Sequence, residues 1–111
     1  MQELFNKAEH ALQQGHALAD QGDIHGAITS FSQALKHLET IKPQRRRDQL
    51  LADVYLSRYQ VSLNFSGPSA YSDLRWGYSY AKTSQDLFLR SKAEQLWQVF
   101  LQQQQAHRQR H

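Results

Sequence analysis

Six histidines are the residues of this chain best suited to binding a metal ion, but their spacing argues against a metal site. His10 and His16 lie six residues apart, so a helix would not place them on one face. No His-Glu-x-x-His motif and no pair of carboxylates accompanies them, and the chain has no cysteine. His107 and His111 are four residues apart, yet a polar tail is the simpler interpretation. We therefore expect neither a metal nor another cofactor.

Side chains that could catalyse a reaction are present but form no recognisable arrangement. Serine, histidine and aspartate occur throughout the chain, as they do in any small domain. No nucleophile–base pattern, phosphate-binding loop or carboxylate pair stands out. The sequence predicts a binding protein and not an enzyme.

Arg45, Arg46 and Arg47 form the densest run of positive charge. Such a run could contact nucleic-acid phosphates or an acidic protein. No aromatic residue interleaves with it and no known nucleic-acid-binding fold fits the chain, so a solvated loop is the simpler interpretation. Association with nucleic acid through this loop and the basic C-terminal end stays an alternative.

Tyrosine and tryptophan are concentrated between residues 55 and 80. Packing between helices should bury most of these rings, but narrow apolar stripes cannot bury all of them. Exposed tyrosine and tryptophan are common among the residues that dominate binding energy at protein interfaces. We expect a binding role for at least one of Tyr55, Tyr59 and Trp76.

Helical spacing of apolar residues indicates the elements that must position these side chains. The pattern predicts five helices, over residues 3–20, 24–40, 48–64, 70–82 and 85–104. Asp23 is suited to cap the second helix, and Ser84 or Asp86 the fifth. Residues 1–106 should form one all-α domain, followed by a polar basic tail over residues 107–111.

Two stretches interrupt the helical pattern most clearly. Pro43 opposes continuation of the second helix, so residues 41–47 are expected to be a loop. Residues 66–69 read Ser-Gly-Pro-Ser, a strong breaker. Between these stretches the third helix carries an unusually wide apolar surface, which suits packing on two sides.

Glycines within two of the predicted helices indicate close packing. Gly15 should pack against the second helix near Ala27 and Phe31. Gly77 costs its helix about 1 kcal/mol relative to alanine, and close approach of a neighbouring helix would compensate.

The first helix pair resembles one tetratricopeptide repeat (TPR), a helix–turn–helix unit of about 34 residues. The residues that carry the resemblance are Gly15, the Gly22-Asp23 turn, Ala27, Phe31 and Ala34. VYLSRYQVSLN and AYSDLRWGY look like a second, weaker repeat, and Lys92-Ala93 like the start of a truncated third. The resemblance implies antiparallel TPR-like helix pairs with a C-terminal capping helix.

The same resemblance implies a concave groove lined by the first helix of each pair, where a partner protein would bind as a peptide or helix. The residues expected to line it are Leu12, His16, Ala19, Tyr55, Tyr59, Ser62, Lys92 and Leu96.

Some TPR proteins hold acidic chaperone tails with a clamp of five polar or basic residues. The corresponding positions here are Leu12, His16, Ser57, Lys92 and Leu96, and only Lys92 matches. A carboxylate needs several converging donors, so we do not expect binding of chaperone tails.

Composition and charge agree with a small binding domain. The chain has 111 residues, a net charge of +3 and no apolar stretch of signal-peptide or membrane-span length. A soluble cytoplasmic adaptor or assembly factor is the simplest interpretation. A self-assembling subunit, in which the fifth helix packs on another copy, is a further alternative, since the sequence does not indicate the oligomeric state.

Overall fold

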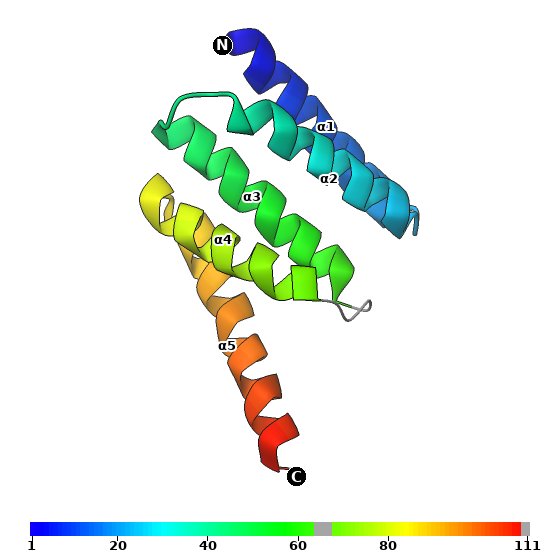
Figure 1. Ribbon diagram of the computed structural model, residues 1–111, viewed down its shortest axis with the longest axis vertical. Coiled ribbons are helices and arrows are strands. Elements are labelled where there is room, and N and C mark those ends of the chain that lie inside the picture. The colour runs from blue at the N-terminus through cyan, green and yellow to red at the C-terminus, as the bar shows by residue number, and fades with distance from the viewer. Residues whose placement is uncertain (64–67, 110–111) are drawn as a thin grey trace.

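The computed structural model describes residues 1–63 and 68–109, which form five α-helices and no strand. The helices are α1 (Gln2–Asp20), α2 (Ile24–Glu39), α3 (Arg45–Ser62), α4 (Pro68–Ser84) and α5 (Leu87–Gln109). Each helix runs roughly antiparallel to the one before it (Figure 1). The predicted all-α fold is confirmed.

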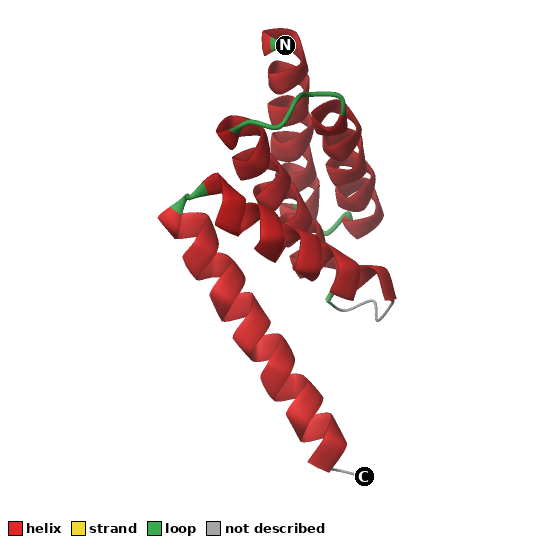
Figure 2. Cartoon of the chain, turned by 60° about the vertical axis from the view of Figure 1, so that its left-hand side comes forward, coloured by secondary structure: helices red, strands yellow, loops and turns green. Residues whose placement is uncertain are grey.

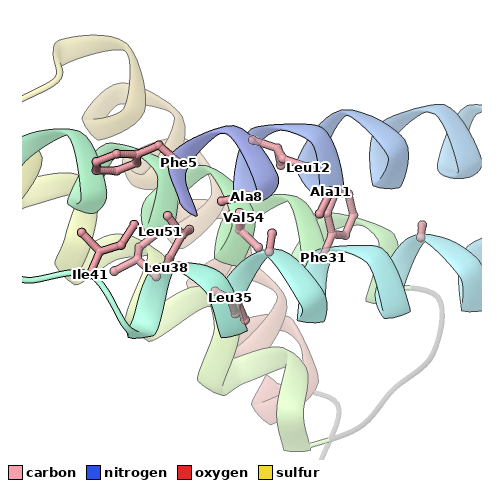
Figure 3. Packing of buried hydrophobic residues seen from close by; sticks show 12 residues of the cluster. Phe5, Ala8, Ala11, Leu12, Phe31, Leu35, Leu38, Ile41, Leu51 and Val54 are labelled. Carbon is pink, nitrogen blue, oxygen red and sulfur yellow. The ribbon is translucent and has the colours of Figure 1, made fainter. Parts of the chain in front are cut away.

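The third helix holds the fold together, because α3 contacts each of the other four helices while α2 and α4 do not pack on each other. Leu51 and Val54 of α3 belong to a first core with α1 and α2, shown in Figure 3. Ala52, Leu56 and Tyr59 belong to a second core with α4 and α5. Each core is thus a helix pair joined by the next helix, a repeat-like arrangement, and the expected two-sided packing of α3 is confirmed.

Gly15 allows α1 and α2 to pack closely. A Cβ atom at Gly15 would lie 2.6 Å from Cδ1 of Phe31, whose ring is fully buried. In the second core, a Cβ atom at Gly77 would lie 2.7 Å from Cδ2 of Leu56. Real side chains do not approach this closely, so both predicted contacts between helices depend on glycine.

An aspartate side chain caps the N-terminus of two of the helices. Asp23 accepts a hydrogen bond from the Gly26 N–H at 2.9 Å, and Asp86 accepts one from the Leu89 N–H at 3.0 Å. Both satisfy amide groups that a helix start leaves without an acceptor. The predicted cap of α2 is confirmed, and of the two candidates for α5 it is Asp86 that caps.

Two predicted boundaries shift at the ends of helices. α5 continues to Gln109, so the first three residues of the predicted tail are helical, and residues 110 and 111 lie outside the described part. The expected breaker falls partly outside it as well, since residues 66 and 67 are not described and the backbone is already helical at Pro68.

The prediction that Arg45, Arg46 and Arg47 lie in a loop is wrong, because these residues form the first turn of α3. Pro43 restricts only its own φ angle and its predecessor. The next residue, Gln44, is extended and serves as the N-cap position. The helix therefore starts as soon as the restriction ends, and the connection from α2 is short.

Candidate functional site

A groove runs across the face formed by α1, α3 and α5. Of these, α1 and α3 are the first helices of the two pairs and α5 is the last helix. We call this groove the inner groove; its volume is about 320 Å³. Its lining residues are Glu9 from α1; Arg46, Gln49, Leu50 and Asp53 from α3; and Asp86, Phe88, Leu89 and Lys92 at the start of α5.

An ion pair forms the wall between α1 and α3. Nη2 of Arg46 donates to Oε1 of Glu9 at 2.6 Å, and the guanidinium carbon lies 4.4 Å from the centre of the Phe5 ring. The pair is partly exposed, so its contribution to stability is modest. It does fix how α1 and α3 lie against each other, although the two residues are far apart in the sequence.

Asp86 joins α3 to α5 on the opposite wall. One carboxylate oxygen caps α5, as described above, and the other accepts a hydrogen bond from Nε2 of Gln49 at 3.4 Å. The start of α5, which presents Phe88 in its first turn and Lys92 in the next, is therefore positioned by its own cap and by a contact with α3.

His16, Asp53 and Ser57 meet where α1 crosses α3, but they do not form a catalytic triad. Ser57 Oγ donates to Asp53 Oδ1 at 3.1 Å, and both oxygens approach the same imidazole nitrogen, Nε2, at 3.5 and 4.0 Å. In a triad the acid and the nucleophile contact different ring nitrogens. Ser57 is also only 2% exposed. The three side chains make a polar contact between helices.

Phe88 is the most prominent apolar group of the inner groove, with 75% of its surface exposed. Lys92 follows one helical turn later and is in none of the ion pairs found among the described residues. An exposed aromatic ring and an available ammonium group thus lie side by side on α5. Together they can bury an apolar side chain and pair with a carboxylate of a ligand.

Of the residues expected to line the groove, His16 and Lys92 lie on the α1–α3–α5 face. Leu12 is buried in the first core. Tyr59 is only 4% exposed and belongs to the second core, so the prediction that its ring faces the groove is wrong. Burial also raises the pKa of the Tyr59 phenol.

Tyr55 points away from the inner groove. Its ring stacks on Tyr80 of α4 with centroids 6.0 Å apart, and the Arg58 guanidinium lies 5.7 Å from its centre. Desolvation by burial, together with the charge of Glu39, raises its pKa. Ser62 lines a different cleft near the C-terminus.

Ala19 and Leu96, the remaining two expected lining residues, are partly buried against the first and second cores respectively.

The groove residues that sequence reasoning missed are mostly polar. These residues are Gln49, Leu50 and Asp53, which follow Arg46 by three, four and seven positions. At this spacing all four lie on one face of α3. This polar stripe is visible in the sequence, but the tyrosines on the opposite side of the helix favoured that side as the groove face. Phe88 was missed because it precedes the apolar stripe that predicted the fifth helix.

The three consecutive arginines connect helices instead of forming a free basic patch. Nε of Arg45 donates to the Ser84 carbonyl at the end of α4 at 2.9 Å. Nη1 of Arg47 donates to the Ile41 carbonyl at 3.1 Å. With the Arg46–Glu9 ion pair, each guanidinium has an internal partner.

Among the side chains that the structure describes, no group of three metal-ligating residues gathers, and no described helix is long and apolar enough to cross a membrane. Comparison with protein-family models gave no match, and neither did the comparisons with curated proteins and with solved structures.

Proposed function

We propose that this chain is a helical-repeat interaction module that binds a peptide or helix of a partner protein in the inner groove. One observation carries the proposal: the highly exposed ring of Phe88 stands beside Lys92 in a groove to which three helices contribute. The likeness of the first helix pair to a TPR supports it, since stacks of such repeats bind on the face of their first helices.

The residues of the inner groove indicate which side chains a partner segment should carry. Burying a phenylalanine ring contributes about 1.5–3 kcal/mol, so Phe88 would be the apolar anchor. Lys92 would pair with a carboxylate one helical turn away. The volume of about 320 Å³ is at the lower end for a binding pocket and suits one or two side chains of a ligand. The partner segment therefore carries an apolar residue close to an acidic one.

The burial of the clamp positions supports the expectation that acidic chaperone tails do not bind here. Leu12 and Ser57 are buried, and Leu96 is partly buried. Only His16 and Lys92 could offer a donor to a carboxylate, and a clamp needs several.

Association with nucleic acid has less support. The Arg45–Arg47 guanidinium groups are engaged with Ser84, Glu9 and Ile41. A phosphate would have to displace these contacts, which join α3 to its neighbours.

A capture experiment with two matched variants tests the proposal. Wild-type protein, Phe88→Ala and Trp76→Ala are immobilised and exposed to extract of the native host, and bound proteins are identified by mass spectrometry. Trp76 is also an exposed aromatic residue, but it lies on α4 and outside the groove. We expect a protein that wild type and Trp76→Ala retain and Phe88→Ala loses. Equal retention by all three would rule out the inner groove as the binding site.

A further inference from the structure

The charged side chains of the inner groove differ in whether the protein itself supplies their partners. Three carboxylates and two cations line the groove. Glu9 is paired with Arg46 at 2.6 Å. Asp86 is engaged through both oxygens, one in the cap of α5 and the other in the contact with α3. Of the charged groups in the groove, Asp53 of α3 and Lys92 of α5 are therefore the two that a ligand can use.

Asp53 keeps most of its hydrogen-bonding capacity. A carboxylate can accept about four hydrogen bonds. Oδ1 of Asp53 accepts one from the buried Ser57 hydroxyl at 3.1 Å, and Nε2 of His16 lies 4.0 Å away. Oδ2 is in none of the hydrogen bonds found among the described residues. Ser57 is neutral, and His16 carries a charge only when it is protonated. The hydrogen bond from Ser57 thus orients the carboxylate, which is 36% exposed, without neutralising it.

Lys92 supplies the opposite charge on the other wall of the groove. It lies near the start of α5, one turn after Phe88 and close to the short connection from α4 that Figure 2 shows. None of the ion pairs among the described residues joins it to Asp53 or to any other carboxylate. The groove therefore presents a separate anion and a separate cation on two different helices, together with an exposed aromatic ring.

Building on the proposed function, we propose that the inner groove selects a partner segment that also carries a basic residue, which pairs with Asp53. The acidic residue of the same segment pairs with Lys92, and its apolar residue packs on Phe88. Carboxylates outnumber cations by one along the groove, so a basic residue brings the lining to neutrality. Arginine suits Asp53 best, because its two parallel N–H groups can reach Oδ2 and the remaining lone pair of Oδ1.

Asp53 also determines which segments the groove rejects. A ligand that covers this carboxylate removes water from it, and only a cation on the ligand offsets that cost. An acidic residue in the same place would add repulsion between like charges. The groove should therefore reject a uniformly acidic segment, even though Lys92 attracts one of its carboxylates.

Selection from a phage-displayed library of random peptides tests this inference. The library is selected on the wild-type protein, and peptides that also bind Phe88→Ala are discarded. We expect the remaining sequences to combine an apolar residue with an acidic and a basic one. Recovery of no peptide that depends on Phe88 would contradict the proposed function and this inference with it. Peptides that depend on Phe88 but lack a basic residue would contradict this inference alone.

Matched variants then locate the partner of the basic residue. A selected peptide is titrated by calorimetry into wild type, Asp53→Asn and Asp20→Asn. Asparagine keeps an acceptor for Ser57 and removes only the charge, so we expect binding to weaken about tenfold. Asp20→Asn removes the same charge from an exposed position at the end of α1, outside the groove, and should bind like wild type. Equal affinity of wild type and Asp53→Asn overturns the inference and leaves the proposed function standing.

A change in the peptide completes the test. Glutamine in place of the basic residue should weaken binding to wild type by about the same tenfold factor and should change binding to Asp53→Asn very little. This non-additivity is expected only if the basic residue and Asp53 contact each other. Equal losses with wild type and Asp53→Asn would show that the basic residue binds elsewhere, which contradicts the assignment. Circular dichroism of each variant checks that the helices are retained.

Discussion

Arg58 of α3 and Asp73 of α4 are joined by two parallel hydrogen bonds, from Nε to Oδ2 at 2.7 Å and from Nη2 to Oδ1 at 2.6 Å. The third guanidinium nitrogen, Nη1, donates to Ser32 Oγ of α2 at 3.1 Å. The Asp73 side chain is 5% exposed and that of Arg58 22%. The hydrogen bonds to Asp73 raise the pKa of Arg58 above its already high ordinary value. One side chain therefore links α2 and α4, which do not pack directly on each other.

Removing Arg58 should strongly destabilise the fold. Arg58→Ala leaves the Asp73 carboxylate buried without its partner, which costs about 3–5 kcal/mol. Urea unfolding followed by circular dichroism measures the free energy. Arg58→Lys should recover only part of the loss, since an ammonium group cannot make both hydrogen bonds. Arg90→Ala, which removes an exposed arginine, is the control and should change stability by less than about 0.5 kcal/mol. A small effect of Arg58→Ala would contradict the structural role of the pair.

Adding volume between α1 and α2 should also be destabilising. Gly15→Ala forces its methyl group against the buried Phe31 ring, which costs about 1–3 kcal/mol. Ala27→Leu should act in the same direction, because Ala27 is fully buried in the same core. Thermal unfolding measures both, with Gln14→Ala on the exposed side of α1 as the control. If Gly15→Ala unfolds at the wild-type temperature, the two helices are further apart than described.

Replacing Gln85 by glycine should stabilise the protein. Gln85 has a φ of 60°, in the left-handed region, where a side chain costs roughly 1–2 kcal/mol. Glycine removes this cost but adds flexibility to the unfolded chain, so the expected net gain is about 0.5–1 kcal/mol. Gln33→Gly, at an exposed position inside α2, should instead lose about 1 kcal/mol. Chemical denaturation of both variants checks the opposite signs.

Ionisation of the Tyr59 phenol should lower the free energy of unfolding at alkaline pH. Burial raises the pKa of its phenol above the ordinary 10.0. Below pH 10 both the folded and the unfolded chain keep the proton. Above it the unfolded chain releases the proton first, so the free energy of unfolding falls until the raised pKa is passed.

Tyr59→Phe removes this dependence. The Tyr59 hydroxyl makes no hydrogen bond within the described part of the chain, so we expect a change of less than about 1 kcal/mol at neutral pH. Relative to wild type, the variant should gain stability as the pH rises above 10. Urea unfolding of both proteins across this range measures the difference, in which the other tyrosines cancel. Parallel pH curves would contradict a raised pKa.

A peptide with an acidic chaperone-type C-terminus should bind no better than its scrambled control. Leu12 has no donor group, and the Ser57 hydroxyl is buried and donates to Asp53, so neither offers a donor at positions where the clamp needs one. Isothermal titration calorimetry checks this expectation. Micromolar affinity that disappears when the terminal carboxylate is amidated would show that the chain holds such tails in another way.

Local physical chemistry was enough to predict the helices. Helical spacing of apolar residues identified all five. The Asp23 cap could be predicted because it depends on residues close together in the chain. The contact of Gly15 with Phe31 could be predicted because the spacing of small and aromatic residues in the first helix pair resembles that of a TPR. The wide apolar surface of α3 also predicted that it packs on two sides. The first turn of α3 was missed, because Pro43 restricts only its own φ angle and its predecessor. The acceptors for Arg45 and Arg46 in this turn, on Ser84 and Glu9, come from distant parts of the chain and could not be predicted.

Only the tertiary structure decided which side of α3 faces the groove. A helix apolar on two sides can be rotated in more than one way, and the tyrosines could equally have been exposed or buried. The Arg58–Asp73 pair and the close contact between Gly77 and Leu56 select one rotation, which buries Tyr59 and turns the polar stripe with Asp53 toward α1 and α5. These are contacts between residues 15 or more positions apart. Periodicity within a single helix contains no information about them, so the sequence determined the elements and the packing determined the site.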